Sequence, residues 1–339
     1  MEHAVFIGRF QPFHHAHLET VRFALKQANK LIIVIGSAGG SRNVKNPWST
    51  AERIAMITAC LSKEEQDRVS FVCAKDYSYN NNLWLSALQS AFAEAAPDMD
   101  DSKTVLVGHK KDTSSFYLSL FPQWQFIETG IKFDTKMDAT KVRENLFRQD
   151  SLTLKTQVPG PVLEMLLEYM KTDEYKRLHE EWHHIEGYKA EWAGSPFPPT
   201  FNTVDAVVVC SGHVLLVRRK AAPGRGLLAL PGGYINAHEE LVDACLRELK
   251  EETSIRIPPP ELKARIEMEK TFGSPNRSLR GRTITHAYLI NLGGGKLPEV
   301  HGDDDADKAF WLPFREVMLR EDQFFDDHWH MINFFVNRF

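Results

Sequence analysis

The stretch that decides the fold is Ala4-Val-Phe-Ile-Gly-Arg-Phe-Gln-Pro-Phe-His-His-Ala-His17. It begins with a continuous apolar run, which is typical of a strand buried on both faces, and it leads directly into a segment of helical spacing. Where a strand passes into a helix, free backbone N–H groups and the helix dipole favour phosphate oxygens. The stretch therefore predicts a phosphate site at the carboxyl end of a buried strand.

The sequence around this stretch alternates between two kinds of segment. Continuous apolar runs, which we interpret as strands buried on both faces, lie at 4–8, 31–35, 69–73 and 105–108. Segments of helical spacing lie between them, at 17–29, 50–61 and 83–95. This alternation predicts an α/β fold, a doubly wound parallel sheet of the Rossmann-like kind. Ligands in such sheets bind at the carboxyl ends of strands.

The second half of the chain follows a different pattern. Helical spacing from 159 to 186 ends at Gly194-Ser-Pro-Phe-Pro-Pro199, where the prolines remove hydrogen-bond donors and fix the backbone. We expect a first domain at 1–185 that ends in helices, a Pro-rich linker at 186–200 and a second domain at 201–339. A hairpin around Ser211-Gly212, one helix at 238–253 and further strands make the second domain α+β in character.

The composition agrees with two globular domains. A chain of 339 residues exceeds what one core usually organises. The formal charge of −4, without a broad basic excess, disfavours a nucleic-acid partner. The four cysteines lack CxxC spacing and are expected to be small core residues in a reducing compartment. There is no basic leader and no apolar run of about 18 residues, so we expect a cytoplasmic protein without a membrane partner.

Two histidines are the candidate phosphate ligands of the first domain. His14 and His17 are three residues apart, so on the first turn of a helix they share a face and can donate together to a polyphosphate. Arg9 adds a permanent positive charge. A zinc cluster that includes His15 is the alternative. We favour phosphate binding, with His15 toward solvent, because a separate Thr-x-x-Arg element lies further along the chain.

These residues resemble the HxGH-bearing nucleotidylyltransferase superfamily, and within it the archaeal-type nicotinamide mononucleotide adenylyltransferases. The signature GRFQPxHxGH is matched from Gly8 to His17, with Ala16 in place of the usual glycine. A second signature, (I/S)SxTxxR, is matched by Asp138-Ala-Thr-Lys-Val-Arg143, with Asp138 in place of serine. A cap at Asp138 or Thr140 would place helix N–H groups on phosphate, with Arg143 one turn further on.

Two more segments are similar to this subfamily. The stretch 46–53 resembles NPF(T/S)xxER, and Asn82-Leu-Trp84 resembles the segment whose tryptophan stacks on the nicotinamide ring. An aromatic face suits a positively charged pyridinium, although a core position is the alternative for Trp84. The resemblance implies catalytic roles for His14, His17 and Arg143, assisted by Lys141 or Lys45. It implies substrate binding by Gly8, Arg9, Phe10, Arg53, Trp84, Thr140 and Lys141.

A second chemical motif lies in the second domain: Gly233-x5-Glu239-x7-Arg247-Glu248-Leu-Lys-Glu251-Glu252-Thr-Ser254-Ile255. On a helix its last three glutamates converge on one side, and clustered carboxylate oxygens suit Mg²⁺, which can bridge a diphosphate and activate water. A solvated acidic helix face is the alternative. The motif resembles the Nudix box GX5EX7REUXEEXGU, with Ser254 in place of glycine, and this agreement favours the metal site.

The Nudix resemblance implies further roles. Glu251 and Glu252 would bind metal, Glu248 would bind metal or act as the base, and Arg247 would orient a glutamate. Gly232 and Gly233 would let the backbone approach the substrate. The segment 274–282 is similar to SP-x-R-DPRGR of ADP-ribose pyrophosphatase-like Nudix domains. It implies diphosphate or ribose contacts by three arginines, for which solubilising loop residues are the alternative: Arg277, Arg280 and Arg282. The acidic run 303–305 is a candidate further acid or base.

The whole chain resembles the bifunctional nicotinamide mononucleotide adenylyltransferase/Nudix proteins of bacteria. The resemblance implies that ATP and nicotinamide mononucleotide give NAD and pyrophosphate. It also implies that ADP-ribose is hydrolysed to AMP and ribose 5-phosphate with Mg²⁺, or with Mn²⁺ as an alternative metal. Two alternatives stay open: a Nudix domain that senses ADP-ribose or NAD without cutting it, and another phosphate acceptor such as nicotinate mononucleotide. A homo-oligomer also stays open.

Overall fold

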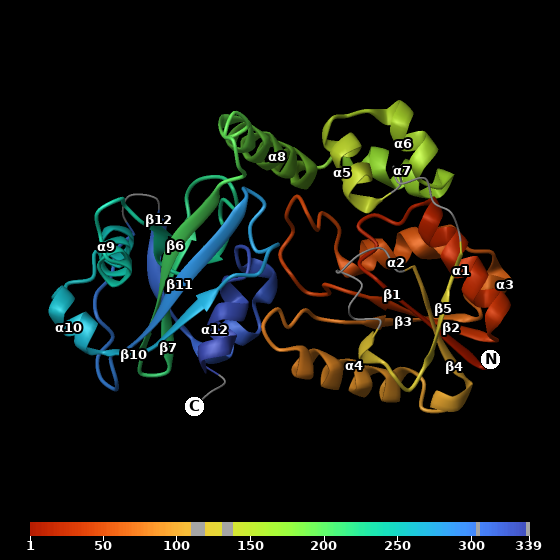
Figure 1. Cartoon of the computed structure of the whole chain (residues 1–339), viewed down its shortest axis with the longest axis horizontal. Helices are drawn as coiled ribbons and strands as arrows, with labels where there is room; N and C mark the ends of the chain where they lie inside the picture. The colour runs from red at the N-terminus through yellow and green to blue at the C-terminus, as the bar shows by residue number, and fades with distance from the viewer. Residues whose placement is uncertain (110–118, 131–137, 303–305, 337–339) are drawn as a thin grey trace. The chain divides into compact units, whose positions relative to one another are not determined.

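A computed structural model describes residues 1–109, 119–130, 138–302 and 306–336 of the chain (Figure 1). The chain forms two compact units, Met1–His179 and Glu180–Phe339. The division falls inside helix α8 (Asp173–Glu191), earlier than the Pro-rich segment 186–200 in which we expected the linker. Residues 186–191 of that segment are helical.

The first unit contains a parallel sheet in the order β3-β2-β1-β4-β5 (Figure 1). The order reverses between β1 and β4, so the predicted doubly wound sheet is confirmed, and a ligand is expected at this switch point. The strands are β1 (His3–Gly8), β2 (Lys30–Ile35), β3 (Val69–Cys73), β4 (Thr104–Gly108) and β5 (Gln125–Glu128). The helices are α1 (His15–Gln27), α2 (Thr50–Ala59), α3 (Lys63–Gln66), α4 (Asn81–Ala95), η1 (Asp101–Lys103), α5 (Ala139–Phe147), α6 (Ser151–Gln157) and α7 (Gly160–Tyr169).

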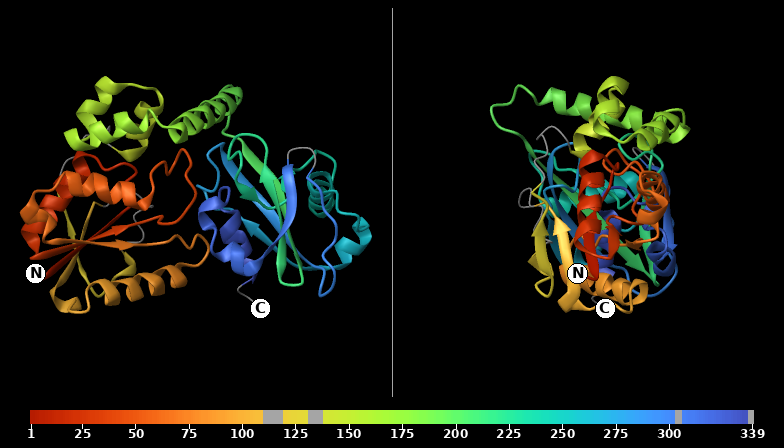
Figure 2. Two further views of the ribbon diagram at one scale, coloured as in Figure 1. Left: turned by 180° about the vertical axis from the view of Figure 1, so that it is seen from behind. Right: turned by 90° about the vertical axis from the view of Figure 1, so that its right-hand side faces the viewer.

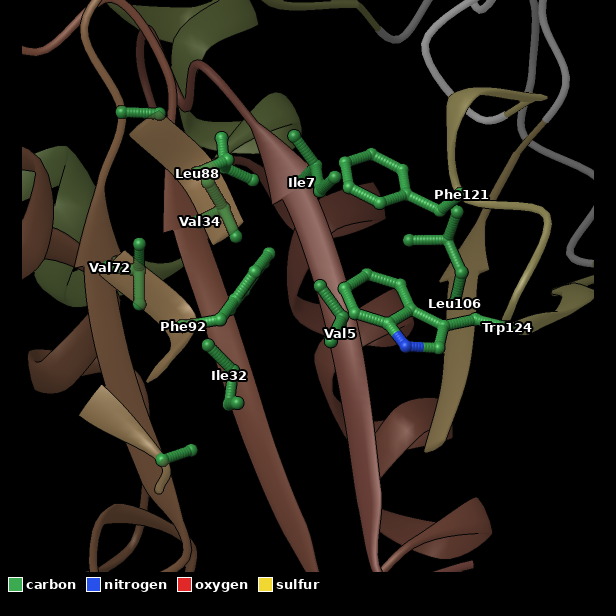
Figure 3. Packing of buried hydrophobic residues seen from close by; sticks show 12 residues of the cluster. Val5, Ile7, Ile32, Val34, Val72, Leu88, Phe92, Leu106, Phe121 and Trp124 are labelled. Carbon is green, nitrogen blue, oxygen red and sulfur yellow. The ribbon is translucent and has the colours of Figure 1, made fainter. Parts of the chain in front are cut away.

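One hydrophobic cluster covers a face of this sheet (Figure 3). Leu88 and Phe92 of α4 pack with Phe121 and Trp124 against alternate side chains of the strands, namely Val5, Ile7, Ile32, Val34, Val72 and Leu106. Strand β3 was expected to be buried on both faces, and this prediction is wrong. It lies at the sheet edge, where Val72 is its buried residue.

The second unit contains a mixed sheet in the order β10-β11-β6-β7-β12, with β8 paired to β7 and β9 paired to β6. The predicted hairpin joins β6 (Thr200–Cys210) to β7 (His213–Arg219), and Ser211 and Gly212 adopt φ values of +45° and +73° in its turn. The other strands are β8 (Leu228–Ala229), β9 (Gly232–Tyr234), β10 (Ile266–Phe272), β11 (Arg282–Asn291) and β12 (Ala306–Pro313).

Helices lie on both faces of the second sheet (Figure 2). Helix α9 (Leu241–Thr253) packs Leu246 and Leu249 on Val204 and Ala206 of β6, and α12 (His328–Val336) lies on the opposite face. The remaining helices are α10 (Pro259–Ala264), α11 (Phe314–Met318) and η3 (Glu321–Gln323). The mixed sheet with flanking helices confirms the predicted α+β character of this unit.

Two general expectations can be compared with the structure. Cys210 and Cys245 are buried, as expected of small core residues, whereas Cys73 is exposed at the end of the edge strand β3, so the expectation is wrong for this residue. Among the described residues, none of the helices combines the length and the apolar character that a bilayer crossing requires.

Candidate active sites

The turn after β1 shapes the first site. Phe10 adopts a φ of +52°, and its ring folds back onto Gly8. A Cβ atom at Gly8 would lie 2.8 Å from a carbon of that ring, so the turn requires glycine there. Phe10 itself is buried, with ring centroids 5.3 Å from Phe6 and 4.9 Å from His17. Gly8 and Phe10 therefore shape the turn that leads to His14 and His17. Their predicted contacts with substrate stay predictions.

The two signature histidines lie together at the start of α1. The rings of His14 and His17 are stacked with centroids 3.6 Å apart and an angle of 20° between their planes. Burial, together with His14, holds the pKa of His17 well below its ordinary value. Helix α1 has no side-chain cap and no acidic residue in its first turn, so its N–H groups and dipole are open to an anion. This arrangement brings together the groups that the sequence predicted as phosphate ligands.

Arg143 of α5 joins the second signature to the first. Its Nη1 donates to the backbone carbonyl of Gln11 at 2.5 Å, and its Nη2 donates to Oγ1 of Thr140 at 3.2 Å. Burial and the nearby positive charge of Arg9 lower the pKa of Arg143 to about 10. Like charges held this close to one another are unfavourable in the empty site, and a bound polyanion would reverse that cost. The electrostatics therefore fit a polyphosphate.

Arg53 of α2 lies beneath this site and is 1% exposed. Its guanidinium donates to the backbone carbonyl oxygens of Arg9, Gly36, Ser37 and Ser49, at 2.7, 2.6, 3.2 and 3.3 Å. These bonds tie the turn after β1 to the turn after β2, so they support a positioning role for Arg53. Its predicted contact with substrate stays a prediction.

Gln11 is a positioning residue for which we predicted no role from the sequence. Its side-chain amide donates to the carbonyl of Trp48 at 2.8 Å and accepts from the backbone N–H of Trp48 at 3.1 Å. Gln11 is 2% exposed, so this paired contact is shielded from water. The Gln-Pro pair within the signature was the available signal, but only the fold shows which distant segment the amide holds.

The N-terminus of α5 departs from the expected phosphate cradle. Asp138 caps the helix, and its side chain accepts from the backbone N–H of Lys141 at 2.9 Å. The cap is where the sequence placed it, but the carboxylate occupies an N–H group that we expected to face phosphate. Thr140 and Lys141 are exposed beside it. Asp138 thus places a negative charge at a site that otherwise gathers positive charge.

Two further predicted residues of the first unit, Trp84 and Lys45, contact other parts of that unit. Trp84 is half-buried, packs against the core cluster of the sheet and meets the ring of Phe121 edge-on at 6.1 Å. This is the core contact that the alternative interpretation required, and stacking on a nicotinamide ring stays a prediction. Lys45 lies in the loop before α2, where its backbone N–H donates to Oδ1 of Asn43 at 2.9 Å.

The second site is built on α9. Arg247 connects three glutamates: it donates to both oxygens of Glu239 at 2.9 and 2.7 Å, to Glu248 at 2.7 Å and to Glu251 at 2.8 Å. Its predicted part in orienting a glutamate is therefore present as a charged hydrogen-bond network. Ser254 ends the helix with a φ of +49° and takes the left-handed conformation that the usual glycine favours.

Strand β9 packs directly against the carboxyl groups of Glu248 and Glu252. A Cβ atom at Gly233 would lie 2.6 Å from the carboxyl group of Glu248, and one at Gly232 would lie 2.2 Å from the carbonyl of Val204. The backbone N–H of Gly232 donates to Glu252 at 3.0 Å. Both positions thus require glycine for a close approach, of Gly232 to the backbone of β6 and of Gly233 to Glu248, and the predicted approach to substrate stays a prediction.

Two carboxylates of α9, Glu248 and Glu252, are partly shielded from water. Burial raises the pKa of Glu252 to about 8 and also raises that of Glu248. No group of three or more His, Cys, Asp or Glu side chains is arranged to hold a metal ion anywhere in the described ranges. These ranges include the three histidines considered as a zinc site. In α9, Glu248 and Glu251 form ion pairs with Arg247. Hard oxygen donors with desolvated charge nevertheless fit a divalent cation that displaces Arg247.

The three arginines of 274–282 have different surroundings. Arg277 is buried and forms a two-point ion pair with Asp327 at 3.0 and 2.8 Å, so any contact with substrate would have to share these donors. Arg282 donates to the carbonyl of Gly273 at 2.8 Å. Arg280 lies over the ring of Tyr234 at 5.5 Å. The acidic run 303–305 lies outside the described residues.

Comparison with families and relatives agrees with this division of the chain. The cytidylyltransferase-like family model matches residues 5–117, and the NUDIX domain model matches residues 199–334. The nicotinamide/nicotinic acid mononucleotide adenylyltransferase of Acinetobacter baylyi is 38% identical over 184 residues, which are 53% of this chain and 93% of that protein. The ADP-ribose pyrophosphatase of Methanocaldococcus jannaschii is 33% identical over 108 residues, which are 32% of this chain and 59% of that protein.

Solved structures match both units. A bifunctional NMN adenylyltransferase/ADP ribose pyrophosphatase from Francisella tularensis, complexed with AMP and a Mn ion, is 32% identical with a TM-score of 0.90. The match covers 99% of this chain and 99% of that chain. A second structure of the Francisella tularensis protein gives the same TM-score at 33% identity.

Proposed function

The chain belongs to the family of bifunctional NMN adenylyltransferase/ADP-ribose pyrophosphatases, and from this premise we propose that it carries out both reactions. The first unit transfers the adenylyl group of ATP to nicotinamide mononucleotide and gives NAD and pyrophosphate. The second unit hydrolyses ADP-ribose to AMP and ribose 5-phosphate. The observation that carries the proposal is the presence of two separate sites of the right chemistry, one polycationic and one polyanionic.

Adenylyl transfer needs no nucleophile from the protein. A phosphate oxygen of the mononucleotide attacks the α-phosphorus of ATP, the bond to the β-phosphate breaks, and pyrophosphate leaves. His14, His17 and the open N-terminus of α1 donate hydrogen bonds to phosphate oxygens, and Arg9 and Arg143 neutralise the charge that grows on pyrophosphate. Arg53 and Gln11 hold the loops that carry these groups.

Hydrolysis takes place on the face of α9. Glu248, Glu251 and Glu252 are the residues that would hold a divalent metal, for which we propose Mg²⁺ with Mn²⁺ as a substitute. When bound, such a metal polarises the diphosphate and lowers the pKa of water. Arg247 would stay anchored by its contact with Glu239 when the metal takes its place on Glu248 and Glu251, and β9 lies directly against Glu248 and Glu252. Water adds to one phosphorus and the bridging oxygen leaves with the other phosphate.

Product analysis tests both halves of the proposal. The purified chain is incubated with Mg²⁺ and, separately, with ATP plus nicotinamide mononucleotide and with ADP-ribose, and products are separated by chromatography. We expect NAD from the first mixture and AMP from the second. NAD without AMP would contradict the hydrolase assignment. It would favour the alternative in which the second unit binds ADP-ribose or NAD without cutting it. AMP without NAD would contradict nicotinamide mononucleotide as the phosphate acceptor of the first unit.

The alternative acceptor deserves a direct comparison, because the Acinetobacter baylyi relative is named for both the amidated and the acidic mononucleotide. We propose nicotinamide mononucleotide as the preferred acceptor of this chain. Turnover is measured with nicotinamide mononucleotide and nicotinate mononucleotide at equal concentrations. Faster turnover of the acidic mononucleotide would overturn this preference while leaving the adenylyl transfer itself in place.

A further inference from the structure

A histidine at the start of α12 holds the segment 230–232, which leads into the acidic motif of the second unit. The backbone N–H of Leu230 donates to Nδ1 of His328 at 2.9 Å. Two residues further on, the backbone N–H of Gly232 donates to the carboxyl group of Glu252 at 3.0 Å. The segment therefore joins His328 at one end to a proposed metal ligand at the other.

The surroundings of His328 keep its Nδ1 atom an acceptor. His328 is 7% exposed, and burial lowers the pKa of His328 to about 3, so the ring is neutral at neutral pH. Because Nδ1 accepts from Leu230, the proton of the neutral ring lies on Nε2. Leu230 is also buried, so removal of this acceptor would leave its backbone N–H without a partner and away from water.

Asp205 of β6 fills the space beside the same segment. Its Oδ1 atom lies 3.9 Å from Nδ1 of His328, and a Cβ atom at Gly232 would lie 2.7 Å from this oxygen. Its Oδ2 atom accepts from Oγ1 of Thr285 at 2.5 Å, and Asp205 itself is buried. Gly232 therefore has no room to shift toward this side chain if its other neighbours change.

A buried ion pair fixes the residue before His328. Arg277 donates to the two carboxylate oxygens of Asp327 at 3.0 and 2.8 Å, and the two side chains are 5% and 8% exposed. A two-point contact with a guanidinium sets both the distance and the direction of a carboxylate. The ion pair therefore ties the segment 274–282 to the start of α12, and it limits where the ring of His328 can lie.

We propose that this ion pair and His328 are positioning groups, which place Glu252 for a divalent cation through the segment 230–232. The inference rests on the hydrolase activity proposed above. It gives Arg277 a role in alignment, in place of the diphosphate or ribose contact that the sequence resemblance implies. Replacing residues that hold a metal ligand from behind commonly changes metal affinity or activity by about 10-fold to 100-fold.

The test removes the acceptor of His328 and keeps the bulk of its side chain. His328→Phe retains a ring but offers no acceptor, whereas His328→Asn retains an oxygen acceptor close to the position of Nδ1. His330→Phe is the matched control, because His330 is half-buried two residues further on, on the other side of the same helix. All variants are made in the full chain.

Two measurements without substrate report the alignment itself. Hydrogen exchange of the peptide 228–235 is followed by mass spectrometry in EDTA, and the binding of Mn²⁺ alone is followed by the electron paramagnetic resonance of the free ion. Comparison with Glu251→Gln identifies the Mn²⁺ that binds on α9. In His328→Phe we expect faster exchange in this peptide, and Mn²⁺ binding on α9 that is weakened about 10-fold to 100-fold. His328→Asn and His330→Phe should stay within about threefold of the wild type in Mn²⁺ binding.

Arg277→Lys distinguishes alignment from a contact with substrate, and it gives a second test should His328→Phe fail to fold. Lysine keeps the charge but cannot make the two-point contact with Asp327. We expect Mn²⁺ binding to weaken about 10-fold or more, and the KM for ADP-ribose at saturating Mn²⁺ to change less than about threefold. A raised KM with unchanged Mn²⁺ binding would mean that Arg277 contacts substrate, and the inference would be wrong.

The other outcomes are also decisive. Unchanged exchange and unchanged Mn²⁺ binding in a folded His328→Phe chain would overturn the inference. Equal losses in His328→Asn and His328→Phe would overturn it as well, because packing alone would then explain them. A wild-type chain that hydrolyses no ADP-ribose, with variants that behave as expected in both measurements, would contradict the proposed function and support the alignment.

Discussion

The guanidinium of Arg143 donates a hydrogen bond of 2.5 Å to the backbone carbonyl of Gln11. The two residues are separated by most of the first unit in sequence, yet this bond fixes α5 against the turn that follows β1. The Nη1 atom of Arg143 thus aligns the two segments. Burial and the positive charge of Arg9 lower the pKa of Arg143, so its charged form is less favourable than in water. We expect a bound triphosphate to supply the counter-charge.

Replacing Arg143 by lysine should therefore lower kcat for NAD synthesis by about 10²-fold to 10³-fold, because lysine keeps the charge but cannot make both contacts of the guanidinium. ADP-ribose hydrolysis by the same protein is the internal control. Steady-state kinetics of both reactions checks the prediction. A variant with unimpaired synthesis would show that the link to Gln11 is dispensable.

The two activities should be separable by mutation. His17→Ala should lower adenylyl transfer by about 10²-fold or more and spare hydrolysis, since His17 belongs to the first unit alone. Glu251→Gln should do the reverse, because it removes a charged oxygen from the proposed metal-binding face. Both reactions are assayed on each folded variant. Loss of both reactions from either one would contradict independent sites.

Asp138→Ser should improve the use of ATP. Serine retains a cap for α5, whereas it removes the carboxylate that faces the expected triphosphate. We expect the KM for ATP to fall about threefold to tenfold, with a smaller change in kcat. Asp150→Ser is the matched control, since Asp150 caps α6 in the same way by accepting from Thr153. An unchanged or higher KM for ATP in Asp138→Ser would show that this carboxylate does not oppose the nucleotide.

Gly233→Ala should abolish most hydrolysis without affecting NAD synthesis. The added Cβ would lie 2.6 Å from the carboxyl group of Glu248, so either the strand or the glutamate must move. We expect kcat for ADP-ribose hydrolysis to fall about 10²-fold or more, because displacing a metal-binding or catalytic group by about 1 Å has an effect of this size. Gly194→Ala, where an added Cβ meets no atom within 4 Å, is the control. Normal hydrolysis by Gly233→Ala would exclude the close contact.

The metal-free protein should lose stability as the pH rises. Burial raises the pKa of Glu252 from its ordinary 4.5 to about 8, so the folded state holds a proton that the unfolded chain releases between these values. The free energy of unfolding therefore falls from about pH 4.5 to about pH 8, and bound metal opposes the fall. Glu252→Gln should raise the unfolding temperature of the second unit at pH 8 in EDTA and leave it nearly unchanged at pH 4.5. Equal effects of the substitution at both pH values would contradict this assignment.

Local sequence signals were sufficient for most of the framework. Continuous apolar runs predicted β1, β2 and β4, because strands buried on both faces must be apolar throughout. Helical spacing with Glu248, Glu251 and Glu252 on one side predicted the chemistry of α9, because positions three and four apart share a face. By contrast, the edge position of β3 and the short β5 were not evident, since sheet order depends on pairing between distant segments.

The sequence by itself determined which residue types stand at the turn after β1 and along α9, and hence predicted two chemistries: a cationic site for polyphosphate and an acidic site for a cation. Only the tertiary structure decided how those residues are used. Arg53 and Gln11 hold loops, Arg277 pairs with Asp327, and Arg280 lies on Tyr234. The physical reason is that a donor's role depends on the nearest acceptor and on its exposure to water, and both are set by segments far away in the chain.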